Sequence, residues 1–229
     1  MKPIRLTYEQ VMAQLEAWGS ESVRGIYARQ GAGENQFGVK MGDLRGLAKK
    51  LKTDHPLALQ LWATGNLDAM ILATMLMDSV QLTRAEVEVM LHPLNYYRLV
   101  DEFTYNTIAN AAFVETLRLQ WMNSPEEMTG RAGWNLLIAR LTSGNHASLD
   151  YEAILAQIEA EVKTAPRYKQ ESMNRSLVEI AVRVPALRER CIAIGERLGR
   201  LDDRPVPKGC TSSYAPEWIA AVLRCKPSR

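Results

Sequence analysis

The chain has 229 residues, of which 47% are hydrophobic and 24% are charged, and its formal net charge at pH 7 is +2. Such a chain can bury a sizeable core, and its length fits one extended domain or two small ones; we expect a single domain over residues 1–229. Its longest apolar stretch, residues 69–77, is too short to cross a bilayer, which argues against a membrane protein.

The first five residues lack the apolar segment of a secretory signal, so we expect a cytoplasmic protein. Cys191, Cys210 and Cys225 are odd in number and have no CxxC spacing, which suits free thiols in a reducing compartment. No phosphate loop, zinc motif, nucleophile elbow or dinucleotide fingerprint is present, and the three histidines are dispersed. We therefore expect neither a metal nor an organic cofactor.

Helix signals recur along the chain, and no stretch alternates like a β-strand. Residues 83–86 have the sequence of a capping box, and residues 124–127 combine an N-cap serine with a proline at the first helical position. Apolar residues between Tyr151 and Val162 recur at the spacing of one helical face. The sequence predicts helices near residues 7–18, 20–30, 41–52, 56–64, 67–77, 83–91, 96–119, 125–142, 151–163, 167–183, 185–198 and 216–224.

Short helices of unequal length, joined by short loops, are typical of degenerate helical repeats, in which each helix pair packs against the next. We therefore predict an all-α solenoid with a long concave surface. A compact helical bundle is the alternative, but it would need helices of more equal length.

A basic patch and one helical pair are the candidate functional features. Between residues 39 and 52 there are five basic residues and one acid, so positive charge is concentrated locally although the net charge is small. Tyr97 and Asp101 are four residues apart, so an aromatic ring and a carboxylate can border the same ligand. The alternative is a solvated acid beside a core tyrosine. The tryptophans at 62, 121, 134 and 218 are interpreted as core residues.

The stretch Gly38–Lys49, followed by Leu61–Gly65, resembles the start of the DNA alkylation repair family of AlkD-like glycosylases, which are built on HEAT-like repeats. The resemblance continues through Trp121–Ser124 to Arg131, through Lys169–Leu177, and through residues 208–211 to Trp218. It covers most of the chain from about residue 24. It implies a HEAT-like helical-repeat solenoid with a concave basic groove, and double-stranded DNA as the partner. We expect the protein to be a monomer.

The resemblance also implies roles for individual residues. Tyr97 and Asp101 look like the family's groove aromatic and its catalytic acid. The phosphate-contact candidates are Lys40, Arg45, Arg131, Lys169, Arg175 and Arg183. Where the family has a second tryptophan, Arg175 follows Asn174. Arginine can stack on a base, but it would repel a cationic lesion.

Two functions are compatible with these residues. The one we expect is a monofunctional DNA glycosylase that excises cationic N3- or N7-alkylpurines, with Asp101 stabilising the sugar cation. The second is a catalytically inactive HEAT-like module that binds DNA or a protein through the same groove. A pure protein-interaction solenoid would instead have a groove lined by apolar residues.

Overall fold

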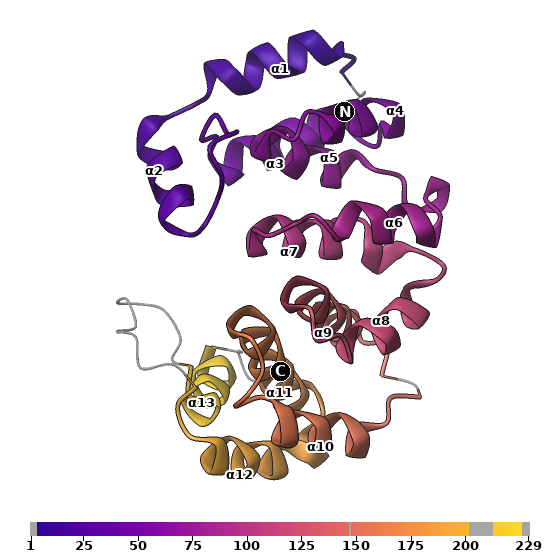
Figure 1. Cartoon of the computed structure of the whole chain (residues 1–229). Helices are drawn as coiled ribbons and strands as arrows, with labels where there is room; N and C mark the ends of the chain where they lie inside the picture. The colour runs from indigo at the N-terminus through magenta and orange to yellow at the C-terminus, as the bar shows by residue number, and fades with distance from the viewer. Residues whose placement is uncertain (1–3, 147, 202–212, 226–229) are drawn as a thin grey trace. The chain divides into compact units, whose positions relative to one another are not determined.

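The computed structural model describes residues 4–146, 148–201 and 213–225, and these residues form only helices, turns and loops (Figure 1). The predicted all-α class is therefore confirmed. The chain divides into two compact units, residues 1–115 and 116–229, and each is considered by itself. A repeat domain can contain two such units, so the single domain over 1–229 stays a prediction, as does the concave groove.

Unit 1 is built around α5 (Leu67–Leu76), a helix whose side chains are buried on nearly every side. It packs against α3 (Met41–Leu51), α4 (His55–Ala63) and α7 (Tyr97–Asn106) (Figure 1). The other elements are α1 (Tyr8–Ala17), α2 (Glu21–Arg29), η1 (Ser79–Gln81), α6 (Arg84–Leu91) and η2 (Ile108–Asn110). The predicted capping box at Thr83 and Glu86 begins α6, as expected.

Unit 2 is built around α11 (Arg167–Arg183), which has the bounds that the sequence predicts. It packs against α9 (Glu127–Thr142), α10 (Tyr151–Glu161), α12 (Arg188–Leu198) and α13 (Ala215–Cys225). The remaining elements are α8 (Val114–Met122), which begins at the unit boundary, and η3 (Pro185–Leu187). Trp121 and Trp134 are buried, as predicted, and so are Ile154, Leu155, Ile158 and Val162. Two other tryptophans predicted for the core, Trp62 in unit 1 and Trp218 in unit 2, are only partly buried.

Three predicted helices differ from the structure, and one of them, over 185–198, begins as the short turn η3 before α12 starts at Arg188. The expected helix over 96–119 is interrupted after Asn106, and at the break the Thr107 hydroxyl donates a hydrogen bond of 2.9 Å to the carbonyl of Thr74 on α5. Helix α9 begins at Glu127 rather than at residue 125. The Ser124 hydroxyl accepts a hydrogen bond from the Glu126 amide, a short turn that precedes the helix instead of capping it.

Candidate nucleic-acid interface

Tyr97 and Asp101 lie one turn apart on α7, and both side chains are half-buried. Tyr96, which precedes the helix, is buried, and its ring packs edge-on against the Tyr97 ring with centroids 5.4 Å apart. The Tyr96 hydroxyl donates to Gln30 Oε1 at 3.2 Å. Burial raises the pKa of Tyr96 to about 12, so this hydroxyl stays protonated at neutral pH. Tyr97 is therefore supported by a fixed aromatic neighbour.

Arg98 connects α7 to α2. Its Nη2 lies 3.4 Å from Gln30 Oε1, and its guanidinium lies over the Tyr27 ring at 5.8 Å from the centroid. The Tyr27 hydroxyl in turn donates to the Val39 carbonyl at 2.8 Å. These contacts of Arg98 anchor the start of α7 to α2. Arg98 is also the residue with which Asp101 would pair if Asp101 served to stabilise α7.

Glu102, the residue after Asp101, belongs to a polar network that joins three helices of unit 1. Its carboxylate lies 3.2 Å from Arg45 Nη2 on α3 and accepts a hydrogen bond of 2.9 Å from Asn106. Asn106 also donates to the Thr74 hydroxyl on α5 at 3.0 Å. The network fixes the turn of α7 that carries Asp101 and leaves Arg45 largely exposed.

The basic patch is a surface of unit 1. Lys40 and Arg45 are exposed, and so are the other cations of the patch, Lys49, Lys50 and Lys52. The loop leading into α3 is fixed by the fully buried carboxylate of Asp68, which accepts hydrogen bonds of 2.7 to 3.0 Å from the amides of residues 37–39. Sequence reasoning missed Asp68. The available signal was an acid inside an otherwise apolar helix.

Arg131 lies on α9 of unit 2 and is buried at the N-terminal end of α11. Its Nη1 donates to the Tyr168 carbonyl at 2.9 Å and lies 3.3 Å from Glu171. The Tyr168 amide donates to Glu127 at 2.8 Å, which caps an otherwise unsatisfied donor of α11. Arg131 therefore holds α9 and α11 together in addition to any contact with DNA.

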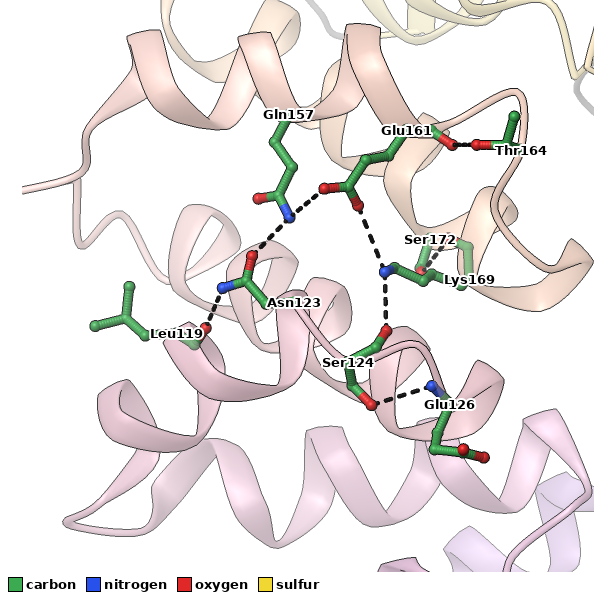
Figure 2. Close-up of polar contacts among 9 residues, drawn as sticks. All are labelled: Leu119, Asn123, Ser124, Glu126, Gln157, Glu161, Thr164, Lys169 and Ser172. Carbon is green, nitrogen blue, oxygen red and sulfur yellow. Dashed lines mark hydrogen bonds and ion pairs between the residues drawn. The ribbon is translucent and has the colours of Figure 1, made fainter.

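Lys169 is enclosed within unit 2 (Figure 2). Its ammonium donates to the Ser124 carbonyl at 2.9 Å and lies 3.6 Å from Glu161. Its aliphatic stem lies over Gly130, where a Cβ would come within 2.6 Å of Lys169 Cδ. These contacts give Lys169 an internal structural role, so we leave it out of the proposed DNA interface although the sequence suggested it.

Arg175 and Arg183 lie on α11 on either side of Glu179. Arg183 Nε is 2.8 Å from Glu179, whereas Arg175 Nε is 3.9 Å from it. Arg175 is also the more exposed of the two. The candidate cations of unit 2 therefore differ: Arg131 and Arg183 are tightly held, and Arg175 has the greater access to a ligand.

The described residues offer little for other classes of site. None of their helices is long and apolar enough to cross a membrane, and they contain no group of His, Cys, Asp and Glu side chains that could hold a metal ion. Unit 1 has an apolar pocket of about 370 Å³ between α4 and α6, lined in part by Leu59, Trp62 and Val89. Phosphates would find no partner there.

Residues 11–219 match the model of the DNA alkylation repair enzyme family. Because the match covers most of the chain, the chain belongs to that family, as the sequence motifs indicated. One part of the predicted resemblance, residues 208–211 with Cys210, lies outside the described residues.

Two similar proteins extend this assignment. The chain is 20% identical over 228 residues to the uncharacterized protein Lin0241 of Listeria innocua serovar 6a, a match that covers 96% of this chain and 98% of that one. A solved structure from a new family of proteins related to the HEAT-like repeat DNA glycosylases, with affinity for branched DNA structures, is 25% identical. The match to this structure covers 96% of our chain and 94% of the chain in that structure, with a TM-score of 0.85. The predicted HEAT-like repeat fold is thus confirmed.

Proposed function

We propose that this protein binds DNA through phosphate contacts during alkylation repair, and that it prefers branched DNA to a simple duplex. The single observation that carries the proposal is the likeness, over nearly the whole chain, to a protein described as having affinity for branched DNA structures. The family of the chain makes DNA the expected partner. We further propose that the protein acts as a cytoplasmic monomer.

Exposed cations support this function. Lys40 and Arg45 in unit 1, and Arg175 in unit 2, are accessible to phosphates. The remaining candidates are Arg183, which is partly exposed, and Arg131, which is buried. Phosphate contacts carry no sequence information, so we expect binding that is indifferent to base sequence. Counterion release makes such binding fall steeply with salt concentration.

Excision of cationic N3- or N7-alkylpurines is the second candidate function, and the placement of Tyr97 and Asp101 one turn apart on α7 favours it. The positive charge of such a base weakens its glycosidic bond, so the base leaves with the bonding electrons and needs no strong acid. Water then bonds to the anomeric carbon and loses a proton. Asp101 would stabilise the sugar cation and orient the water, and Tyr97 would offer its ring to the same cation.

Arg175 makes excision the less favoured candidate. It stands where the family pattern has a tryptophan, and a guanidinium repels a cationic base that an indole ring would attract. The same guanidinium attracts a phosphate. The substitution therefore shifts the expected ligand from a charged lesion toward the DNA backbone.

One experiment separates these functions. The purified protein is titrated against a four-way junction and a duplex of the same arm sequence, at low and physiological salt, and is then incubated with methylated duplex DNA. We expect tighter binding to the junction, a steep loss of affinity with salt, and little release of 7-methylguanine or 3-methyladenine. Equal affinity for both substrates would overturn the branched preference, and an affinity independent of salt would overturn the phosphate contacts.

A further inference from the structure

Charged residues of α11 recur every four residues, with arginine and glutamate in alternation. The series consists of Arg167, Glu171, Arg175, Glu179 and Arg183. Each step of four residues rises about 6 Å and turns by about 40°, so the series winds slowly around the helix. Arg167 and Arg175 are about 12 Å apart along the axis and 80° apart around it, whereas Arg183 is turned by about 160° from Arg167. Arg167 and Arg175 can therefore face one ligand, whereas Arg183 lies on nearly the opposite side of the helix from Arg167.

Arg167 is the exposed member of a cluster at the start of α11. Its guanidinium lies 5.3 Å from the centroid of the Tyr168 ring, and Arg131 lies 5.8 Å from the same centroid. Glu171 lies between the two arginines, 3.3 Å from Arg131 and 3.8 Å from Arg167. The carboxylate thus has its shorter contact with the buried arginine and its longer contact with the exposed one.

The cluster has the features of a phosphate-binding position. The ring limits the freedom of the Arg167 guanidinium, so less conformational entropy is lost when a ligand binds. Arg167 remains 54% exposed, and its ion pair at 3.8 Å is long enough to be exchanged for a shorter one. Arg167 and Arg175 lie about 12 Å apart along the helix axis, so the two cations can reach separate phosphates of one DNA molecule.

We propose that Arg167, positioned over Tyr168, binds a DNA phosphate together with Arg175, and that the phosphate displaces Glu171 from Arg167. This inference rests on the proposed DNA-binding function and assigns to it a contact that the family motifs do not include. Glu171 keeps Arg131 when Arg167 is released. Tyr168 is a positioning residue, because it acts through Arg167.

The test compares Arg167→Gln with Arg197→Gln in the full chain. Arg197, on α12 of the same unit, is 57% exposed and also pairs with a glutamate, Glu159. It therefore controls for the loss of one exposed, ion-paired guanidinium. We expect Arg167→Gln to weaken junction binding by roughly three- to tenfold and to reduce the slope of log affinity against log salt by about one. Arg197→Gln should match the wild type.

Two further variants test the arrangement of the cluster. Glu171→Gln should strengthen binding by roughly twofold or more, because it removes a competitor for Arg167 and a charge that repels phosphates. Tyr168→Leu should weaken binding while the salt slope stays nearly unchanged, since the cation remains but loses its platform. Melting temperatures of all variants identify any that fail to fold.

The experiments distinguish an error in the Arg167 contact from an error in the proposed function. If the wild type binds DNA and Arg167→Gln behaves like Arg197→Gln, the Arg167 contact is overturned and the proposed function stands. If the wild type does not bind a junction or a duplex at low salt, the proposed function itself fails.

Discussion

The guanidinium of Arg45 on α3 lies 3.2 Å from the carboxylate of Glu102 on α7, the residue that follows Asp101. Arg45 is 64% exposed, whereas Glu102 is only 15% exposed and is held by Asn106 as well. The arginine can leave the ion pair, because Asn106 still donates a hydrogen bond to the Glu102 carboxylate when Arg45 is gone. Glu102 stays in place when Arg45 moves.

We predict that Arg45→Gln lowers DNA affinity and reduces the salt slope by about one, because one phosphate contact is lost. The measurement is fluorescence anisotropy with a labelled duplex across a salt series. Arg84→Gln is the matched control, since Arg84 lies in the same unit and also pairs with a glutamate, Glu88. If both variants lose the same DNA affinity, the loss results from the change in net charge and not from a phosphate contact of Arg45.

Lys169→Met should destabilise the fold without changing the DNA affinity of the folded protein. The substitution leaves the Ser124 carbonyl without the Lys169 donor and removes the ammonium that pairs with Glu161. Loss of one such partner costs about 1 to 3 kcal/mol. Urea unfolding followed by circular dichroism measures it, with Lys163→Met as the exposed control. If the Lys169→Met protein is as stable as the wild type but binds DNA more weakly, Lys169 contacts the DNA and our structural assignment is wrong.

The position of Lys169 illustrates what the sequence could not predict. Local patterns correctly predicted the bounds of α11 and the capping box of α6, because these depend on residues a few positions apart. The enclosure of Lys169 depends on Ser124, 45 residues away, and on the space that Gly130 leaves for its stem. No spacing rule within one helix reports such contacts.

The same limit applies elsewhere in the chain. The break after Asn106 coincides with a contact between Thr107 and Thr74, 33 residues apart, and the path of the loop into α3 depends on Asp68, about 30 residues away. The candidate residues Tyr97 and Asp101 could be placed on one helix from spacing and family motifs together. Their neighbours from other helices, such as Gln30 and Arg45, came only from the structure.

The Cys191 thiol should react far more slowly than that of Cys225. Cys191 is buried and Cys225 is exposed, and burial raises the pKa of the Cys191 thiol from its ordinary 9.0 to about 11. The thiolate is the reactive form, so at pH 8 a native Cys191 is almost entirely unreactive. A chain with Cys210→Ser and Cys225→Ser isolates it, and labelling in urea supplies the unprotected rate. Equal labelling rates with and without urea would contradict the burial.

The same thiol gives a pH dependence of stability with a defined sign. Its pKa is raised in the folded state, so the protonated thiol stabilises the fold fully below pH 9. That contribution is lost as the pH rises through the interval from 9 to about 11. Between pH 9 and about 11, the melting temperature of Cys191→Ala should therefore fall less than that of the wild type.

Arg175→Trp should raise the excision of cationic alkylpurines and lower affinity for branched DNA, because it restores the family's aromatic ring and removes a cation. Arg175→Ala should lower affinity without raising excision. Single-turnover release of 7-methylguanine and junction titrations on the same preparations measure both effects. If neither variant changes either quantity while both remain folded, Arg175 does not contact the DNA.

Asp101→Asn tests the excision candidate directly. Carboxylate and amide have nearly the same shape, so α7 should keep its packing, while the charge that would stabilise the sugar cation is removed. Removal of one preorganised stabilising group costs about 3 to 4 kcal/mol of barrier, or roughly a hundredfold to a thousandfold in rate. Any base release by the wild type should therefore fall by that factor. DNA affinity should stay the same or rise, because a carboxylate repels phosphates before the reaction.

Glu16→Gln controls for the loss of one negative charge in the same unit, because Glu16 is an exposed acid on α1 and lies outside the network that fixes the turn of Asp101. If Asp101 serves the transition state, only Asp101→Asn loses excision. If Asp101 instead stabilises α7, the asparagine variant should lose melting temperature, DNA affinity and any activity in parallel. Wild-type excision by a folded Asp101→Asn protein would remove the residue from the mechanism. Absence of excision from the wild type, together with junction binding, would leave Asp101 as part of a binding surface alone.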